Sequence, residues 1–598
     1  MITELSNYVD SLGEKLDWLL FENRSLEAGE YYLYEPDNNE PRKFSLKFHF
    51  EVNKKGEFTD GIEQSEVYTY LRDNEYFQKL FLSRCVNSNK TLVKQISTNN
   101  HFVIQFNTKN YEKLTGSIDK FYKTSGELYF DKINEFGFSE ESAYAQSIFR
   151  EILEQSGRFN PTDEKFITVI FNLPLDFVTH LSEIYFKLKI YNVNDFTIEN
   201  GNLGLHSFKI NTNVKKPLQF SQSSFTHSFR LAEFKTAINL NVFENLLRLK
   251  ENKIPNPLPI FIYSDQMNNK IIETVKETGK LSLRDIIIEL KEKHSTNLDN
   301  YYLLNWGKGM TISINDFDYV EKFIYELTDF KVYKLLQNTK EVENIKTIFE
   351  FEVKVANAIF NNLLITGKDK PSFHYFDDLS SNTGFNKIPN KRLIKNLVKS
   401  RYAIYEFIYK SKTNAISGTT FYNLILSNIT DLILSSEKLP FESIKNILNI
   451  LFSQNHKFDI NNNNFGGREM PSEIPKYFDK ITTLVNDTGT ELNDDYEYAF
   501  CAGQLVYYLI SQSQSSNKTH SLVEPFINRT TVESFNDQLI RTFNQYKHAI
   551  NFNNRKFNKL FEQVIGYNPA ATYKEMLPVF FAGYFSDNIL YKSKEEIN

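Results

Sequence analysis

The chain is 598 residues long, with 41% hydrophobic and 24% charged residues, so it carries enough apolar surface to fold and is not a wholly disordered protein. At about 150 residues per domain, this length suggests about four folded units. The net charge of −6 excludes a protein that is basic over its whole surface, so any contact with nucleic acid must be local.

Residues 1–335 are predicted to form a region of mixed helices and strands. Apolar side chains recur at helical spacing over 3–21, and they alternate with polar residues over 44–52, as in a half-buried strand. Similar patterns predict helices at 64–83, 141–155, 235–250 and 281–293, and strands at 103–106, 167–171, 259–263 and 301–305. The irregular connections between them are typical of an α+β region.

From residue 336 onward the pattern is almost entirely helical. We predict helices at 339–364, 389–411, 419–435, 441–454, 473–486, 494–513, 532–550, 553–565 and 573–591. We divide this part into a helical region at 336–469 and a helical bundle at 470–598. The predicted fold class is therefore α+β, with a mixed α/β N-terminal region followed by a mainly α-helical bundle C-terminal region.

Two C-terminal helices have features that predict how they pack. Small and apolar residues share one face of the helix at 494–513, namely Ala499, Ala502, Gly503, Val506 and Ile510. A glycine inside a helix costs about 1 kcal/mol relative to alanine, so we expect a neighbouring helix to cross closely at Gly503. The helix at 573–591 is apolar on nearly all sides and contains Pro578 and Gly583, which predicts a buried, bent helix.

The two cysteines, Cys85 and Cys501, cannot form a CxxC pair or a four-cysteine zinc site. We expect each to be a small buried side chain in a reducing compartment. No apolar stretch is long enough for a transmembrane helix, which needs about 18 residues. The N-terminus carries acidic residues where a signal peptide carries basic ones, so we expect a cytoplasmic protein.

Sequence motifs of common enzymes are missing. The chain has no P-loop, GxGxxG, HExxH, GxSxG or kinase signature, and we expect no cofactor. The best set of metal ligands is His374, Asp377 and Asp378, which would lie close together on a loop. This set predicts either a hydrogen-bonded surface loop or the site of a metal-dependent nuclease.

A first group of cations lies on the predicted helix at 389–411. Lys391, Lys395 and Lys399 follow one another at intervals of four residues, with Arg392 and Arg401 beside them. The opposite face is expected to be buried through Leu393, Leu397 and Val398. Such a row of cations can neutralise phosphates and release counterions. It can also be the ordinary solvated face of an amphipathic helix.

A second group of cations lies at the junction of the helices at 532–550 and 553–565. It contains Lys547, His548, Arg555, Lys556 and Lys559, with Asn544, Asn551 and Asn553 nearby. Cations at a helix junction can hold a phosphate backbone without reading its sequence. They can equally be surface charge at the ends of helices.

Several runs resemble a known family. Three lie near the end of the chain, namely EYAFCAGQLVYYLISQSQSSNKTHSLVEPF, FNQYKHAINFNNRKFNKLF and FFAGYFSDNILY. Two earlier runs are similar to it as well, NPLPIFIYSD at 256–265 and YYLLNWGKGMTISINDFDYVEKF at 301–323. The family is the large subunit of the type I-B CRISPR effector complex, Cascade. The first 200 residues carry no match to it.

The resemblance implies a protein that is not an enzyme. In the family, the large subunit binds target double-stranded DNA at the protospacer-adjacent motif, aids strand opening and helps recruit the helicase–nuclease in antiviral defence. The implied partners are crRNA, target DNA, the helicase–nuclease, and the CRISPR backbone, small-subunit and repeat-processing proteins, with no membrane. The resemblance also implies that 1–335 dock on crRNA and backbone and recognise the motif, and that both groups of cations lie near DNA.

The family's C-terminal part resembles the small subunit of the complex, which some members also make from an internal start. Met470 is a candidate for such a start, because Gly466 and Gly467 can be encoded by a purine-rich ribosome-binding site. It can also be a simple loop residue. Two alternatives to the surveillance subunit stay open, a helical scaffold that binds only protein and a nuclease that uses His374, Asp377 and Asp378.

Overall fold

The structure is a computed structural model. It describes the whole chain apart from residues 23, 59–61, 85–95, 97, 111–112, 115–117, 124–125, 157–164, 187–202, 206–230, 250–251, 295–297, 309–311, 338, 340, 368–370, 378–390, 436–440, 454–467, 487–488, 515–518, 552 and 593–598. Cys85, Asp378 and the side chain of Lys391 lie outside the described residues. Within them, no helix is long and apolar enough to cross a membrane.

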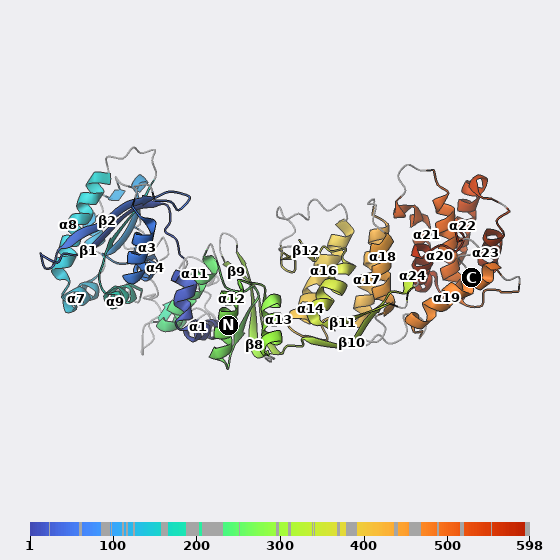
Figure 1. The fold of residues 1–598 in the computed structure, drawn as a ribbon, viewed down its shortest axis with the longest axis horizontal. Coiled ribbons are helices and arrows are strands. Elements are labelled where there is room, and N and C mark those ends of the chain that lie inside the picture. The colour runs from blue at the N-terminus through green and yellow to red at the C-terminus, as the bar shows by residue number, and fades with distance from the viewer. Residues whose placement is uncertain are drawn as a thin grey trace, which may run out of the picture. The chain divides into compact units, whose positions relative to one another are not determined.

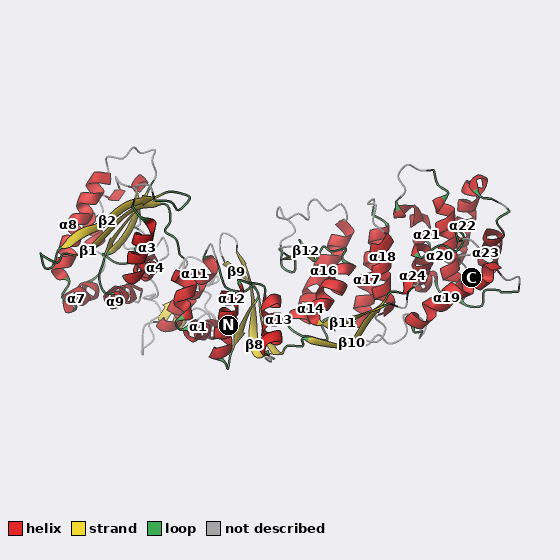
Figure 2. Cartoon of the chain, in the orientation of Figure 1, coloured by secondary structure: helices red, strands yellow, loops and turns green. Residues whose placement is uncertain are grey.

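The chain folds into two compact units, one of residues 1–296 and 300–319 and the other of residues 297–299 and 320–598. Helix accounts for 59% and strand for 16%, and the sheets are small, with the helices concentrated in the C-terminal part (Figure 2). The predicted α+β fold class is thereby confirmed. Our finer division at 335/336 and 469/470 stays a prediction.

The first unit contains a four-stranded sheet in the order β2-β1-β4-β3. Its strands are β1 (Gly29–Pro36), β2 (Phe44–Val52), β3 (Val103–Asn107) and β4 (Phe166–Phe171). β1 pairs antiparallel with β2 and parallel with β4, and β3 pairs antiparallel with β4. The strands predicted at 44–52, 103–106 and 167–171 are confirmed, whereas β1 was missed because its run of tyrosines lacks a clear alternation.

Two helices cover one face of this sheet, α3 (Gln64–Asp73) and α4 (Tyr76–Arg84). Tyr31, Leu33 and Phe50 from the strands are at most 2% exposed and share a core with Val67 and Leu71 from α3. Our prediction of one continuous helix at 64–83 is therefore wrong, because the segment forms two helices. A break occurs there, and Glu75 takes a positive φ of 54°.

The remaining elements of the first unit come from all parts of its sequence. The N-terminal helix α1 (Ile2–Leu12) ends at Gly13, where φ is 50°, so the helix predicted at 3–21 continues only as the short α2 (Lys15–Asp17) and a π-helical turn at Trp18–Glu22. The other elements are η2 (Thr108–Asn110), α6 (Ile118–Lys123), α7 (Glu127–Glu135), α8 (Ser139–Ser156), α9 (Leu175–Tyr185), β5 (Leu203–Leu205), β6 (Leu231–Glu233), α11 (Phe234–Arg248), β7 (Leu258–Phe261), α12 (Asp265–Thr278), α13 (Leu283–His294), β8 (Asp299–Lys308) and β9 (Ile312–Lys322).

The second unit begins with strands that we did not expect. β10 (Glu326–Tyr333) pairs antiparallel with β11 (Val342–Thr347), so the helix predicted at 339–364 is wrong up to Thr347 and also beyond Ile359. Pairing with β10 outweighs the local helical pattern of these six residues. The helical segment starts only at Ile348, after Thr347 and Glu350 form a capping box. It continues as α14 (Ile348–Phe351), a π-helical turn (Glu352–Ala356) and α15 (Asn357–Ile359), followed by the short strands β12 (Ile365–Thr366) and β13 (Ser372–Phe373).

The predicted helices from residue 389 onward are all present (Figure 1). They are α16 (Lys391–Tyr409), α17 (Gly418–Ile433), α18 (Phe441–Ser453), α19 (Met470–Asn486), α20 (Asp495–Ser511), α22 (Val532–Tyr546), α23 (Arg555–Gly566) and α24 (Tyr573–Phe585), with the short α21 (Glu524–Ile527) between α20 and α22. α24 ends six residues earlier than we predicted. Met470 is fully buried at the first position of α19, so its interpretation as a loop residue is wrong.

The bundle is centred on the contact between α20 and α24. A Cβ atom added to Gly503 would overlap the carbonyl oxygen of Phe580 and lie 2.6 Å from the amide nitrogen of Tyr584, and one added to Gly583 would overlap the carbonyl oxygen of Phe500. The close crossing predicted at Gly503 is therefore confirmed, with Gly583 as its counterpart. α24 is buried along its length, and Cys501 is buried as expected.

The start of α20 is held by Asp494, which acts as its N-cap. One carboxylate oxygen accepts hydrogen bonds from the amides of Tyr496 (2.8 Å) and Glu497 (3.3 Å), and the other is paired with the guanidinium of Arg468. Burial of Asp494 acts to raise its pKa, but the Arg468 guanidinium and the two amides outweigh burial and hold the pKa below its usual value. Arg468 also stacks on Tyr496, 4.8 Å from the ring centroid.

Replacing Gly503 with alanine is expected to separate α20 from α24. Because the overlapping atoms belong to the backbone of α24, they cannot move aside as a flexible side chain would, and we expect a loss of about 2 kcal/mol or more. Scanning calorimetry of the full chain should show a lower unfolding temperature for Gly503→Ala. Gly566→Ala is the control, since its Cβ would meet no atom within 4 Å. Equal unfolding temperatures for the two variants would contradict the tight crossing.

Replacing Asp494 with asparagine should change how the stability of α20 depends on pH. Asparagine still caps the helix, but it loses the pair with Arg468, at a cost of about 1 kcal/mol in this partly exposed position. Because the folded pKa of Asp494 is lowered, its stabilisation is present above the unfolded pKa and is lost as the pH falls through the folded value. Hydrogen exchange of the α20 amides should therefore be faster in Asp494→Asn than in the wild type near pH 6, and the difference should disappear in acid. A difference that persists in acid would contradict this.

Candidate nucleic-acid interface

Helix α16 is amphipathic and presents its cations to solvent. Leu393, Leu397, Ile404 and Ile408 are at most 1% exposed and form its inner face. On the other side, Arg392, Lys395 and Lys399 are exposed, and Tyr402 continues this face with an exposed fraction of 44%. Val398, which we expected in the core, is 46% exposed, because it lies about 100° around the helix from Leu397.

The acidic residue Asp431 on α17 faces the N-terminal half of α16. Burial raises the pKa of its carboxyl, while the charges of Arg392 and Lys395 and a hydrogen bond from Asn396 oppose this rise. Asn396 donates to Asp431 (2.9 Å) and also to Asn428 (2.9 Å), so it ties α16 to α17. No ion pair joins Arg392, Lys395 or Lys399 to an acidic group among the described residues, so these cations are available to external anions.

Arg401 differs from the other cations of α16 because its guanidinium binds the protein backbone. It donates to the carbonyl oxygens of His374 and Asp377, at 2.9 Å in each case. It therefore fixes the segment from His374 to Asp377. This role is one that helical spacing does not predict.

The candidate metal ligands His374 and Asp377 do come together. His374 Nδ1 lies 2.5 Å from Asp377 Oδ2, and its Nε2 lies 2.7 Å from the hydroxyl of Thr366. Both ring nitrogens are thus engaged, and His374 is only 8% exposed. In the part of the chain that the structure describes, no group of three or more His, Cys, Asp or Glu residues could hold a metal ion. His374 and Asp377 therefore form a hydrogen-bonded pair, and the third candidate, Asp378, lies outside the described residues.

The second group of cations surrounds the turn between α22 and α23. Lys547, His548 and Arg555 are exposed there. Lys556 is partly buried and donates a hydrogen bond of 2.9 Å to the carbonyl oxygen of Lys592, and the Nζ atom of Lys559 is buried without a hydrogen bond. The structure therefore turns three of the five predicted side chains to solvent and directs the other two toward the protein.

One exposed cation was missed in the sequence. Arg541 lies on α22 and is exposed on the same side as Asn544 and Gln545. The spacing of three and four residues could have revealed this face. We overlooked it because Arg541 is not adjacent to another cation in the sequence.

Comparison with family models, with curated proteins and with solved structures found no match to this chain. The functional interpretation of both surfaces therefore depends on the residues themselves and on the resemblance described above.

Proposed function

We propose that the chain is the non-catalytic large subunit of an RNA-guided CRISPR surveillance complex. It would bind target duplex DNA at the protospacer-adjacent motif, aid strand opening and help recruit the helicase–nuclease. The observation that carries the proposal is the exposed cationic face of α16, formed by Arg392, Lys395 and Lys399. The sequence also supports the proposal, because several segments resemble the large subunit. These segments form β7 to β9 and much of α20 to α24.

The exposed cations suit contact with a phosphate backbone. Lysine and arginine on one face of a helix can neutralise several phosphates, and the release of condensed counterions supplies most of the binding free energy. Contacts of this kind position a duplex without reading its bases. In an RNA-guided complex, base pairing with the guide reads most of the target, so the contacts on α16 need only position the duplex, and other residues of the chain would read the short motif.

Three side chains at the turn between α22 and α23 would extend the contact with nucleic acid. Lys547, His548 and Arg555 are exposed, and Arg541 adds a fourth cation on α22. Exposed cations at a helix junction can contact the phosphate backbone of single-stranded or of double-stranded DNA. The proposal also includes a cytoplasmic location and assembly with crRNA, with the backbone and small-subunit proteins, and with the repeat-processing protein.

The first test is co-purification from the native host. A tagged full-length chain should carry crRNA and the other subunits of the complex, which sequencing of the bound RNA and mass spectrometry would identify. The untagged host extract passed over the same resin is the control. Recovery of other proteins without RNA would favour the protein-binding scaffold instead. Metal-dependent hydrolysis of DNA by the purified chain, abolished by Asp377→Ala, would favour the nuclease.

The second test is charge reversal on α16. The triple variant R392E/K395E/K399E should weaken binding of the full chain to duplex DNA by about tenfold or more at low salt, and it should reduce the slope of log K against log salt by up to about 3. Fluorescence anisotropy over a salt series would measure both quantities. The matched control is K54E/K55E/K574E, which changes the net charge equally at three other exposed lysines. Equal affinities for both triple variants would exclude α16 as the contact.

A further inference from the structure

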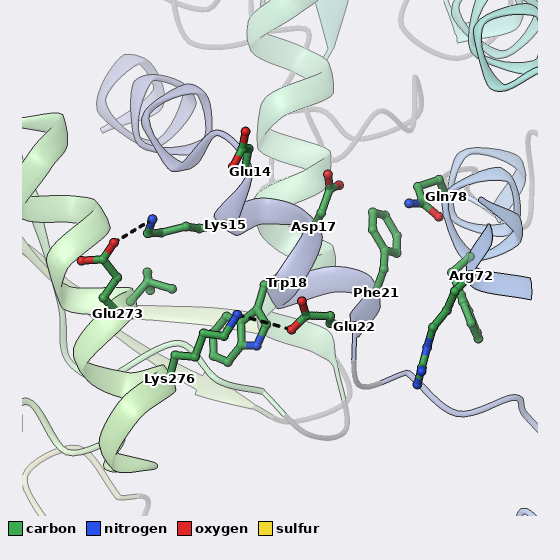
Figure 3. Close-up of a pocket in the computed structure, with 12 residues that line it drawn as sticks. Glu14, Lys15, Asp17, Trp18, Phe21, Glu22, Arg72, Gln78, Glu273 and Lys276 are labelled. Carbon is green, nitrogen blue, oxygen red and sulfur yellow. Dashed lines mark hydrogen bonds and ion pairs between the residues drawn. The ribbon is translucent and has the colours of Figure 1, made fainter. Parts of the chain in front are cut away.

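The first unit contains a pocket of about 530 Å³ that no part of the proposed function uses (Figure 3). One wall is the segment from Glu14 to Glu22, a second is α12, and a third comes from Arg72 on α3 with Phe77 and Gln78 on α4. These segments are far apart in the sequence. The volume is within the range of about 300–1,000 Å³ that is usual for small-ligand sites.

Two ion pairs hold the first wall against α12. Lys15 Nζ lies 2.8 Å from Glu273, and Lys276 Nζ lies 3.5 Å from Glu22. Lys276 also lies over the ring of Trp18, 5.3 Å from its centroid. Because Glu22 and Glu273 are paired with these lysines, their carboxylates join two walls of the pocket and are not free to bind a ligand.

Two further carboxylates in the wall have no such partner. Glu14 and Asp17 are exposed, and neither forms an ion pair or a hydrogen bond with a described residue. Burial and the charge of Glu14 together raise the pKa of Asp17. Two like charges in one wall repel each other, and a cation bound between them would relieve this repulsion.

An aromatic ring lies beside one of these carboxylates, that of Asp17. Phe21 is partly buried, and its ring lies between Asp17 on one side and Arg72 and Gln78 on the other (Figure 3). Phe81 supports the ring edge-on, with centroids 5.7 Å apart. An aromatic face next to carboxylates attracts cations. A guanidinium suits such a site better than an ammonium, because it is planar, stacks on rings and binds carboxylates in a bidentate manner.

The opposite wall offers hydrogen-bond donors. Arg72 is exposed and Gln78 is partly buried, and neither side chain has a hydrogen bond or an ion pair within the described part of the chain. A guanidinium donor fits a carbonyl or carboxylate oxygen. A ligand that satisfies both walls therefore combines a guanidinium at one end with a carbonyl or carboxylate at the other.

We propose that this pocket binds arginine, with the guanidinium held by Asp17 and Phe21, the charge of Glu14 nearby, and the carbonyl or carboxylate end held by Arg72. The arginine is either the free amino acid or a residue of another polypeptide, since both carry the same two groups. The proposal does not depend on DNA binding by α16, and each can fail without the other.

The chain has its own reporter for this site. It contains two tryptophans, and Trp18 lines the pocket. In a Trp306→Phe variant, the emission of Trp18 alone should change with added L-arginine and saturate. L-citrulline, the neutral isostere, should bind at least about tenfold more weakly, because a charge-assisted hydrogen bond is lost. Isothermal titration calorimetry of the unmodified chain would measure the same two ligands without a substitution.

Substitutions in the wall give the matched test. D17N should weaken arginine binding by about tenfold, and F21L by about threefold, because each removes one interaction with the guanidinium. E277Q, on α12 but outside the pocket, should bind as the wild type does. Circular dichroism would confirm that each variant is folded.

The source of the arginine is decided by comparing L-arginine with the peptide acetyl-Gly-Arg-Gly-amide. Saturable binding of the amino acid identifies a small-molecule site, and binding of the peptide alone identifies a site for a protein partner. Either result supports the proposal. Absence of binding by both probes, equal binding of arginine and citrulline, or an unchanged affinity in D17N would overturn it.

Discussion

The C-terminal bundle depends on the close approach of α20 and α24 at two facing glycines. Gly503 and Gly583 each leave no room for a Cβ atom against the backbone of the other helix. This contact allows Gln504, which is 1% exposed, to reach the residues beyond α24 and donate to the carbonyl of Gly583 at 2.7 Å. Gln504 also binds the segment after α24, through the carbonyl of Asp587 and the amide of Ile589. Further along this segment, the carbonyl of Lys592 accepts a hydrogen bond from the side chain of Lys556.

Burial of helix faces explains why the cations of α16 are exposed. Leu393 and Leu397 must leave water, and the helical period then turns Arg392, Lys395 and Lys399 outward. The same constraint does not determine what each cation contacts. Arg401 binds two backbone carbonyls and so supports the fold. The exposed cations of the same helix remain available to a polyanion.

The two surfaces discussed above differ in their chemistry. On α16 the exposed charges are cations that face solvent, which suits an extended polyanion. In the pocket of the first unit, the unpaired charges are two carboxylates, one of them beside an aromatic ring, with a cation on the opposite wall. This arrangement suits a small ligand that carries both signs of charge. The chain's modest net charge of −6 conceals this separation, since opposite local charges cancel in the sum.

Periodicity in the sequence was sufficient to predict the helices from α16 onward, the burial of Leu393 and Leu397 on α16 (though not the exposure of Val398) and the close contact at Gly503, because these depend on residues within a few turns of one helix. Only the tertiary structure decided that residues 342–347 form a strand, that Arg401 and Lys556 turn toward backbone carbonyls, and that Asp17, Arg72 and Glu273 line one pocket. These features arise from contacts between segments distant in the chain. Local patterns do not contain that information, because the partner of each side chain is set by how the elements pack.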